Sequence, residues 1–388
     1  MTILVCINEV DIKPKNIRPS NNKLAIMIDK ILYLVLMLIV YFCNVINNLK
    51  LSKKYIILAI ESSCDDTAAA ILSGRKVLSN CIANQNLIHR AYGGVVPELA
   101  SRAHQSKIIP VVSQALSKAN IDKKELTAIA YTQGPGLLGS LLVGSTFAKS
   151  LAIALNIPLI PINHMNGHLL VHFIKDKKIN PPVFPFLGVT LSGGHTQLVL
   201  VKKHFEMELI GSTIDDAIGE AFDKCGKKLG LSYPAGSQID KLAKVGNSKR
   251  FPFPISNLNG YNVSYSGIKT AFINFIYKQK DPNFISENLN DLCASLQYTL
   301  IQIILNKIEK VAKDYRIDQI VIGGGVAANS EIRNQLEVYA KSNGWKIFLP
   351  PLHYTTDNAA MIGIAGYYKL KQKNYGTVSE SAQARLKL

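Results

Sequence analysis

A strand–turn–strand pattern that occurs twice restricts the possible folds of this chain more than any other feature. In the first copy, apolar residues 55–60 lead into the polar turn Glu61-Ser-Ser-Cys-Asp65-Asp66-Thr67, and residues 68–72 are apolar again. In the second copy, residues 186–191 lead into Ser192-Gly193-Gly194-His195-Thr196, and residues 197–201 form the return run. Two such runs joined by a short polar turn predict a β-hairpin whose tip presents polar groups. The chain should therefore contain two related lobes, each beginning with a hairpin.

Helical segments and further strands follow each predicted hairpin, which places the chain in the α/β class. A duplicated unit of this kind is the layout of the actin-like ATPase superfold, in which a nucleotide lies in a cleft between two related lobes. We predict a first lobe at residues 55–161, completed by a C-terminal helix at 358–388, and a second lobe at residues 162–357.

Residues 1–54 differ from the rest of the chain. A basic, asparagine-rich leader precedes an apolar run at 31–43, which is shorter than the roughly 20 residues that a membrane-spanning helix needs. One interpretation is a membrane anchor or an uncleaved signal, with Lys30 and Lys50 as its flanks. The other is an extension outside the fold. Because no small-residue cleavage site follows the run, we predict a dispensable extension and expect no membrane association.

The composition is that of a globular protein with an acidic partner. Of 388 residues, 48% are hydrophobic and 18% are charged, and the net charge is +17. Basic proteins commonly bind phosphate backbones, so RNA is the expected partner. The six cysteines form no CxxC pair, which indicates reduced thiols and a cytoplasmic protein.

Two histidines, His164 and His168, lie four residues apart after an apolar run at 157–162 that predicts a strand. Residues four apart lie on the same face of a helix, so the two imidazoles can converge on one metal ion. A chance polar pair is the alternative. A third ligand is needed, and Asp357, on a polar loop before a helix of small residues, is the candidate.

Two glycine-rich turns predict contact with a ligand. Gly134-Pro135-Gly136 opens a helix and should leave backbone N–H groups free for an anion, although it lacks the Lys of a P-loop. Gly323-Gly324-Gly325 should let a base or a ribose approach the backbone, with Asn329 available to bond it. Between them, residues 214–224 predict a helix with Asp215 and Asp216 in its first turn. Asp223 lies two turns further along, where it should face a ligand rather than cap the helix.

These motifs together resemble the TsaD family, the tRNA N6-adenosine threonylcarbamoyltransferases, over about residues 55–375. The motifs that carry the resemblance are Glu-Ser-Ser-Cys-Asp-Asp-Thr, Tyr-Gly-Gly-Val-Val-Pro-Glu-Leu-Ala-Ser-Arg, Gly-Pro-Gly, His-Met-Asn-Gly-His, Leu-Ser-Gly-Gly-His-Thr, Asp-Asp-Ala-Ile-Gly-Glu-Ala-Phe-Asp-Lys, Gly-Gly-Gly-Val-Ala-Ala-Asn and Thr-Asp-Asn-Ala-Ala-Met. The resemblance implies that His164, His168 and Asp357 are metal ligands. It implies that the adenylate is held by Thr190, Leu191, Ser192, Gly193, Gly194, Asp223, Gly236, Asp240 and Asn329.

The reaction that the resemblance implies is transfer of a threonylcarbamoyl group from threonylcarbamoyl-adenylate to N6 of the adenosine 3′ of the anticodon. The tRNAs concerned read codons that begin with A. Two His and one Asp favour Fe(II) as the ion, and Zn(II) is also compatible. Asp65 and Asp66 are our candidates for a base or an oriented acid. By the same resemblance, the protein acts with TsaB-like and TsaE-like proteins and receives its adenylate from a TsaC-like enzyme.

Two other classes of function stay open. A metalloprotease of the zincin type would carry a general-base Glu directly after the first His, and this chain has Met165 there. A nucleotide-dependent regulatory ATPase is permitted by analogy with the fold. Such an ATPase would not need the histidine pair.

Overall fold

The computed structural model describes residues 31–39, 55–175 and 180–388. The chain divides into two units, residues 1–54 and residues 55–388. In the first unit, residues 31–39 form a helix with exposed side chains, and the rest of the predicted extension lies outside the described residues. The second unit contains both predicted hairpins and every candidate site residue.

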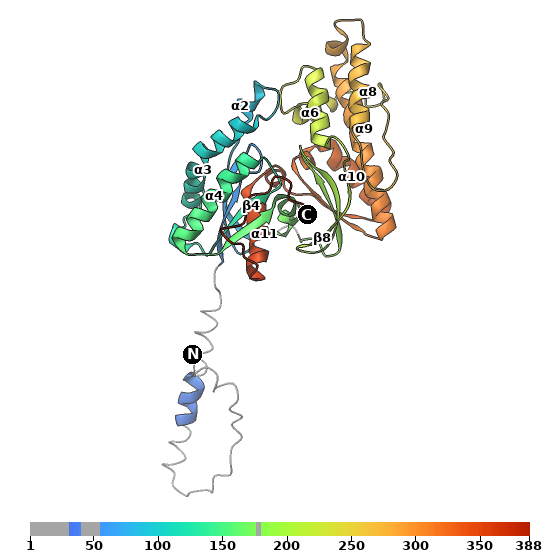
Figure 1. Cartoon of the computed structure of the whole chain (residues 1–388). Helices are drawn as coiled ribbons and strands as arrows, with labels where there is room; N and C mark the ends of the chain where they lie inside the picture. The colour runs from blue at the N-terminus through green and yellow to red at the C-terminus, as the bar shows by residue number, and fades with distance from the viewer. Residues whose placement is uncertain (1–30, 40–54, 176–179) are drawn as a thin grey trace. The chain divides into compact units, whose positions relative to one another are not determined.

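The first sheet begins with the predicted hairpin and has the strand order β3-β2-β1-β4-β5. The strands β1, β2 and β3 pair antiparallel, whereas β4 and β5 join parallel to β1 (Figure 1). The turn between β1 and β2 carries Asp65 and Asp66, as the sequence predicts. The five strands are β1 (Ile56–Glu61), β2 (Thr67–Ser73), β3 (Lys76–Ala83), β4 (Ala128–Gly134) and β5 (Leu159–Asn163).

The second sheet repeats the topology of the first. Its order is β10-β9-β6-β7-β8, and read from β8 it follows the same sequence of third, second, first, fourth and fifth strand. The pairings are also the same, antiparallel for the first three strands and parallel for the last two. The predicted internal repeat is therefore confirmed. Its strands are β6 (Phe186–Leu191), β7 (Thr196–Lys203), β8 (Glu206–Ser212), β9 (Gln319–Gly323) and β10 (Lys346–Phe348).

Helices cover the faces of both sheets and lie between them (Figure 1). The helices α3 and α4 pack on one face of the first sheet, α11 packs on its other face, and α5 contacts strands of both sheets. The helices α6 to α10 belong to the second lobe. Their bounds are α2 (Asn86–Arg90), α3 (Pro97–Ala119), α4 (Leu138–Leu155), α5 (His164–Leu170), α6 (Ile218–Lys228), α7 (Gly236–Ala243), α8 (Ser266–Tyr277), α9 (Phe284–Tyr315), α10 (Ser330–Asn343) and α11 (Ala359–Lys371).

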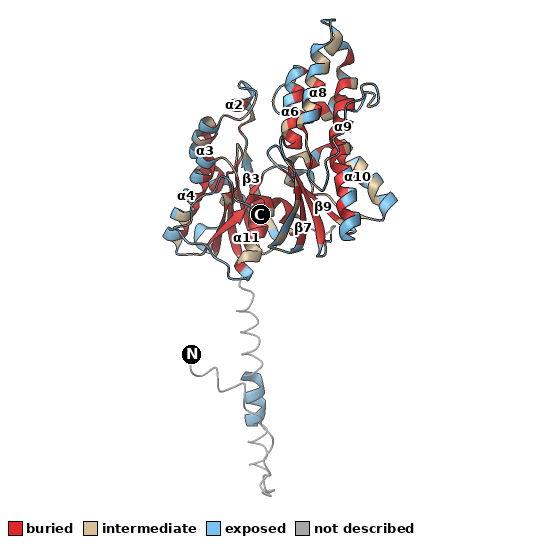
Figure 2. Cartoon of the chain, turned by 45° about the vertical axis from the view of Figure 1, so that its right-hand side comes forward, coloured by how far each residue is buried: buried red, intermediate tan, exposed pale blue. Residues whose placement is uncertain are grey.

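Alternation along the strands assigns their side chains to three apolar cores. On β1, Leu58 and Ile60 point to the core under α3 and α4, whereas Ile57 and Ala59 point to a central core. The central core also receives residues from α5, α11 and the second sheet. A third core joins the other face of the second sheet to helices α6 to α10. Strands buried on both faces read as continuous apolar runs, which explains the sequence of β1; Figure 2 shows this burial in red.

One helix in the described part of the chain, α4, is long and apolar enough to cross a membrane by length and composition. It packs against α3 and β4, and its residues contribute to the core beneath them. Its apolar side chains therefore pack inside the first lobe.

The C-terminal helix is shorter than predicted. It ends at Lys371, and residues 372–388 form a non-helical tail instead of continuing the helix to residue 388. The tail crosses the ends of β4 and β5: the Gln383 amide donates to the Gln133 carbonyl at 2.8 Å, and Asn163 Nδ2 donates to the Lys387 carbonyl at 2.9 Å.

Candidate active site

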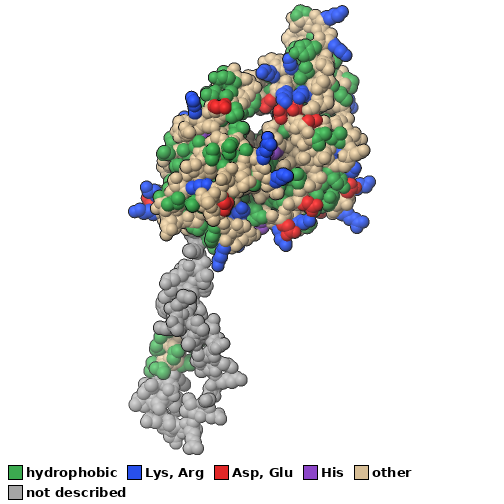
Figure 3. All heavy atoms as spheres, in the orientation of Figure 1, with side chains coloured by type: hydrophobic (Ala, Val, Ile, Leu, Met, Phe, Trp, Pro, Cys, Tyr) green, Lys and Arg blue, Asp and Glu red, His purple; other side chains and the backbone are tan. Residues whose placement is uncertain are grey.

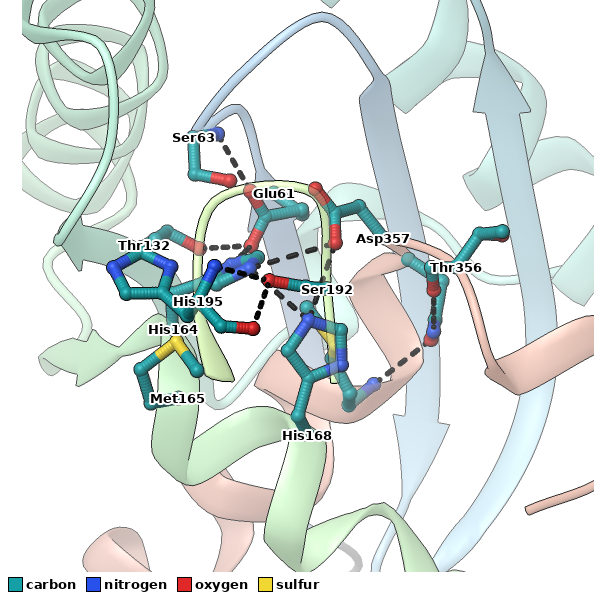
Figure 4. Close-up of polar contacts among 12 residues, drawn as sticks. Glu61, Ser63, Thr132, His164, Met165, His168, Ser192, His195, Thr356 and Asp357 are labelled. Carbon is teal, nitrogen blue, oxygen red and sulfur yellow. Dashed lines mark hydrogen bonds and ion pairs between the residues drawn. The ribbon is translucent and has the colours of Figure 1, made fainter. Parts of the chain in front are cut away.

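The predicted histidine pair converges at the start of α5. The Asn163 side chain accepts a hydrogen bond from the Met165 amide at 2.9 Å and so caps the helix, which places His164 in its first turn and His168 one turn later. Their Nε2 atoms are 3.1 Å apart, and Asp357 Oδ1 lies 3.4 Å from His164 Nε2 and 3.2 Å from His168 Nε2 (Figure 4). The structure thus brings Asp357 to a pair of histidines that lies far from it in the sequence.

The loop that carries Asp357 is held in place by its neighbour. Asn358 Oδ1 accepts from the Met361 amide at 3.0 Å and caps α11, while Asn358 Nδ2 donates to the Thr356 carbonyl at 2.8 Å. The glycine in α5 lets this helix pack closely against α11, since a Cβ on Gly167 would come within 3.2 Å of Met361. This packing brings Asp357 to the histidines.

Glu61 completes the cluster, and the sequence analysis missed it. Its fully buried carboxylate accepts from the Ser63 amide at 2.5 Å, from Thr132 Oγ1 at 2.6 Å and from His164 Nδ1 at 2.9 Å. Burial opposes ionisation, but the neighbouring His164 outweighs it and lowers the pKa of Glu61. A carboxylate only accepts, so Nδ1 of His164 carries a proton. Burial lowers the pKa of His164, but Glu61 and Asp357 outweigh it and raise the pKa well above its usual value, so without a metal ion Nε2 is protonated as well. A bound cation would take the place of that second proton. The signal in the sequence was an acid at the end of an otherwise apolar strand.

The donor set of the cluster fits a divalent metal ion. The two Nε2 atoms and a carboxylate oxygen lie within 4.8 Å of one another. Two imidazole nitrogens with lone pairs facing each other at 3.1 Å repel unless a proton or a cation lies between them. Two His and one carboxylate leave further coordination positions open, as transition-metal sites in enzymes do.

The acidic turn of the first hairpin lies beside this cluster. Burial and the neighbouring Asp357 and Asp65 carboxylates together raise the pKa of Asp66 to about 8. Burial also raises the pKa of Asp65. Asp66 therefore keeps its proton at neutral pH and is a hydrogen-bond donor rather than a base. A cation bound nearby would lower both pKa values.

A histidine from α3 supports the same turn. His104 Nε2 lies 3.0 Å from the Cys64 carbonyl, and its Nδ1 lies 2.8 Å from Thr67 Oγ1. Since a carbonyl only accepts, Nε2 carries the proton and Nδ1 accepts from the hydroxyl of Thr67. Burial lowers the pKa of His104, which keeps the ring neutral.

The second hairpin presents an open backbone at its turn. The Ser192 amide donates to the His195 carbonyl at 2.8 Å, and the His195 amide donates to Ser192 Oγ at 3.0 Å. Gly193 and Gly194 lie between them, and a Cβ on either would meet nothing within 4 Å. In the described part of the chain their amides donate to no carbonyl. Thr190 and Leu191 are buried in β6, and the Thr190 hydroxyl has no partner among the described residues.

His195 is a second residue that the analysis of the sequence left out. Burial, with the nearby His164 and His168, lowers its pKa to about 4, so the ring is neutral and lies close to the cluster. Its neighbour Thr196 accepts from the Ile218 amide at the start of α6, at 3.0 Å.

The predicted helix at 214–224 begins later than expected, at Ile218. Asp215 and Asp216 therefore precede it: Asp215 Oδ1 accepts from the Tyr265 amide at 2.8 Å, and Asp216 pairs with Lys224 at 2.8 Å. Asp223 lies inside α6 and does not cap it; its carboxylate accepts from the Ala235 amide at 2.7 Å, just before α7. Burial raises its pKa, with a contribution from Asp65 across the site.

The two glycine-rich turns, at residues 134–136 and 323–325, make contacts within the protein. A Cβ on Gly323 would lie 2.5 Å from the His168 carbonyl, and one on Gly324, whose φ is +94°, would lie 2.4 Å from the Leu191 carbonyl. The Gly136 amide donates to Ala384 in the C-terminal tail at 3.2 Å, so it is not free for an anion. These glycines permit close packing of backbone against backbone.

The remaining predicted adenylate residues meet at the starts of α7 and α10. Gly236 is the first residue of α7, and Asp240 on the same helix accepts from Ser330 Oγ at 2.8 Å. Asn329 caps α10, with Oδ1 accepting from the Ile332 amide at 3.0 Å. Figure 3 shows a hollow in the surface between α2 and α6, with Lys or Arg side chains beside it.

Comparison with known proteins gives a consistent assignment. The model of the TsaD family, described as tRNA N6-adenosine threonylcarbamoyltransferase, matches residues 76–364. The proteins of that name from Christiangramia forsetii and Riemerella anatipestifer are 58% and 55% identical to this chain. The alignments cover 86% and 87% of this chain and 99% of each relative.

Among solved structures, full-length HypF with bound phosphate and nucleotide has a TM-score of 0.55 at 12% identity. This similarity covers 84% of the chain and 48% of HypF, and it concerns the fold alone. With the repeated sheets it shows the actin-like ATPase fold that the hairpins predict. The chain belongs to the TsaD family of tRNA N6-adenosine threonylcarbamoyltransferases and is a transferase.

Proposed function

We propose that this protein transfers the threonylcarbamoyl group from threonylcarbamoyl-adenylate to N6 of the adenosine 3′ of the anticodon, in tRNAs that read codons beginning with A. The observation that carries the proposal is the cluster of His164, His168 and Asp357, with the acidic turn of the first hairpin and the open turn of the second beside it. In the reaction, N6 attacks the carbamoyl carbon, the bond from that carbon to the phosphate oxygen breaks, and AMP leaves.

The three ligands would hold a divalent ion, with Fe(II) favoured and Zn(II) also compatible, and this ion would supply a Lewis acid for the carbonyl under attack. Glu61 orients His164 so that Nε2 faces the cluster. Transfer of the threonylcarbamoyl group does not require the general-base Glu that a zincin protease carries directly after its first His. In this chain the buried Met165 holds that position.

The two hairpin turns would act on the charges that develop in the reaction. The free amides of Gly193 and Gly194 would donate to the phosphate of the adenylate. Asp66 in its protonated form would donate to the departing phosphate oxygen, and Asp65 would accept the proton that N6 loses. Burial and the nearby Asp65 raise the pKa of Tyr233, which lies in the second lobe just before α7.

The partners belong to the same proposal. The net charge of +17 suits a tRNA substrate. TsaB-like and TsaE-like proteins would assist, a TsaC-like enzyme would supply the adenylate, and the reaction would take place in the cytoplasm.

The deciding experiment is a reconstitution with the presumed partners, threonine, bicarbonate, ATP and an unmodified tRNA, followed by mass spectrometry of the nucleosides. His168→Ala should abolish the threonylcarbamoyl adduct and most of the bound metal. His172→Ala is the matched control, because His172 follows four residues later and bonds the Ile322 carbonyl outside the cluster, at 2.8 Å. The His172→Ala variant should retain both the threonylcarbamoyl adduct and the bound metal.

Other results would favour the other classes of function. Absence of any adduct, together with metal-dependent cleavage of a protein substrate, would restore the metalloprotease. A rate of ATP hydrolysis that depends on neither the metal nor tRNA would favour the regulatory ATPase.

A further inference from the structure

Three buried polar atoms beside the metal cluster make no hydrogen bond with any described residue. They are Nδ1 of His168, the hydroxyl oxygen of Thr190 and Oε1 of Gln197. The side chains of His168 and Thr190 have no exposed surface. Buried polar groups in native proteins nearly always have a partner, and an ordered water molecule often supplies it. Each of the three atoms therefore requires a partner that the described residues do not provide.

Strand pairing places Thr190 and Gln197 side by side on the second sheet. Thr190 of β6 pairs with Gln197 of β7 on one side and with Gly323 of β9 on the other. Side chains of paired residues point to the same face of a sheet, with their Cβ atoms about 5 Å apart. This face is that of the central core, because Val199 and Val201, two and four residues after Gln197, belong to that core. Thr190 and Gln197 therefore point to the side of the sheet on which α5 lies.

The glycine at the end of β9 brings His168 to the same place. A Cβ on Gly323 would lie 2.5 Å from the carbonyl oxygen of His168 and 3.1 Å from its Cβ atom. His168 therefore packs over the position next to Thr190, and neighbouring strands are only about 4.8 Å apart. Polar atoms separated by a little more than a hydrogen bond are commonly bridged by one water molecule. The three atoms thus lie around one small site behind the His168 ring.

Their donors and acceptors are complementary. His168 turns Nε2 toward His164 and Asp357, so when Nε2 binds a metal ion the ring carries its proton on Nδ1. That N–H needs an acceptor, Oε1 of Gln197 needs a donor, and the hydroxyl of Thr190 can be either. Buried water molecules typically make about three hydrogen bonds. One water molecule would therefore satisfy all three atoms.

We propose that Thr190 and Gln197 hold a buried water molecule that accepts the Nδ1–H of His168, and that this water orients the ring for metal binding. Both are then positioning residues, because they act on the ion through His168. The inference rests on the proposed function, which supplies the ion. Metal-binding histidines usually have a partner on their second ring nitrogen. Here the partner of His164 is the buried carboxylate of Glu61, and that of His168 is a neutral water.

The test measures Zn(II) affinity by competition with a chelator, on the full chain without tRNA or nucleotide. Thr190→Val keeps the shape of threonine but lacks the hydroxyl, so it should bind Zn(II) about tenfold more weakly, as expected for loss of such a partner. Thr190→Ser restores the hydroxyl and should bind Zn(II) like the wild type. The matched control is Thr299→Val, because Thr299 is also buried but donates within α9, to the Ser295 carbonyl at 2.9 Å. Its Zn(II) affinity should equal that of the wild type.

A second variant removes the other support of the water. Gln197→Met keeps the length of the side chain but has no amide oxygen, so it should also weaken Zn(II) binding. A crystal structure of the Zn(II)-loaded wild type should show one water molecule within hydrogen-bonding distance of His168 Nδ1, Thr190 Oγ1 and Gln197 Oε1. The crystal structure of Thr190→Val should lack it.

Other results would overturn the proposal. Unchanged Zn(II) affinity in Thr190→Val would show that the hydroxyl does not act on His168. Equal losses in Thr190→Val and Thr190→Ser would assign the effect to packing. A loss in only one of Thr190→Val and Gln197→Met would exclude a shared water, and a wild type that binds no Zn(II) would exclude the site as a whole.

The Zn(II) assay is independent of the transfer reaction. If Zn(II) affinity depends on Thr190 and Gln197 but no tRNA adduct forms, the positioning role stands and the proposed transfer fails. If the adduct forms and both variants bind Zn(II) like the wild type, the transfer stands and the positioning role fails.

Discussion

Glu61 shows how one side chain can organise a site without touching the substrate. It lies at the end of β1 with no exposed surface, and its carboxylate accepts three hydrogen bonds. Partners of this kind fix the tautomer and the direction of a metal-binding imidazole. The cluster therefore consists of three ligands and a buried carboxylate that orients one of them.

Replacing Glu61 should weaken metal binding more than it disturbs the fold. Without the carboxylate, His164 can rotate or carry its proton on Nε2, so Glu61→Gln should lower the metal affinity by about 10- to 100-fold. A chelator competition titration measures this. Thr132→Val is the control, because it removes one donor to Glu61 and leaves the bond to His164 intact. Equal losses in both variants would show that Glu61 acts only by supporting the strand.

At the scale of elements, the two hairpins have the same shape and opposite chemistry. The first turn is acidic, and burial raises the pKa values of Asp65 and Asp66. The second turn has no acid and offers the free amides of Gly193 and Gly194. Repetition of one element on two sheets thus places buried carboxyl groups and unpaired backbone amides near the cluster of His164, His168 and Asp357.

The C-terminal tail is a further element, and its contacts are made by the backbone. Cutting the chain after Glu380 would remove the bonds from Gln133 Nε2 to the Ser381 carbonyl, from Gln383 to Gln133, from Gly136 to Ala384 and from Asn163 to Lys387. Loss of four such bonds should lower the free energy of unfolding by about 2–6 kcal/mol, measured by urea denaturation. Lys387→Ala keeps its carbonyl and should match the wild type. A truncated protein of unchanged stability would show that the tail contributes nothing to the fold.

At the scale of the whole molecule, residues 55–388 contain both sheets, the three apolar cores and every candidate site residue. The two sheets share the same strand order and pairing, but the helices that pack on each sheet differ. The second lobe carries α6 to α10, and three of these helices, α7, α9 and α10, line a cavity of about 410 Å³.

Removal of residues 1–54 should leave a folded and active enzyme. The unit at residues 55–388 has its own cores, so its melting temperature and its yield of threonylcarbamoyl adduct should equal those of the full chain. Differential scanning calorimetry and the reconstitution described above provide the two measurements. Aggregation of the truncated chain, or firm recovery of the full chain in the membrane fraction, would contradict this prediction.

The sequence by itself determined the features that depend on local patterns. Continuous apolar runs around polar turns identified both hairpins, and helical spacing placed His164 and His168 on one face of α5. The family motifs pointed to Asp357 as their partner. Each of these depends on residues close together in the chain or on a motif that can be recognised whole.

Only the tertiary structure decided what the intervening polar residues do. Asn329 and Asp240 are predicted to contact a ligand, and the structure shows that each also bonds within the protein, Asn329 as the cap of α10 and Asp240 as the acceptor from Ser330. Gly323 and Gly324 serve backbone packing, and the role of Glu61 depends on Thr132 and His164. These partners lie far away in the chain, so their proximity follows from how the two lobes and α11 pack. A local pattern carries no information about which distant group will satisfy a buried polar atom.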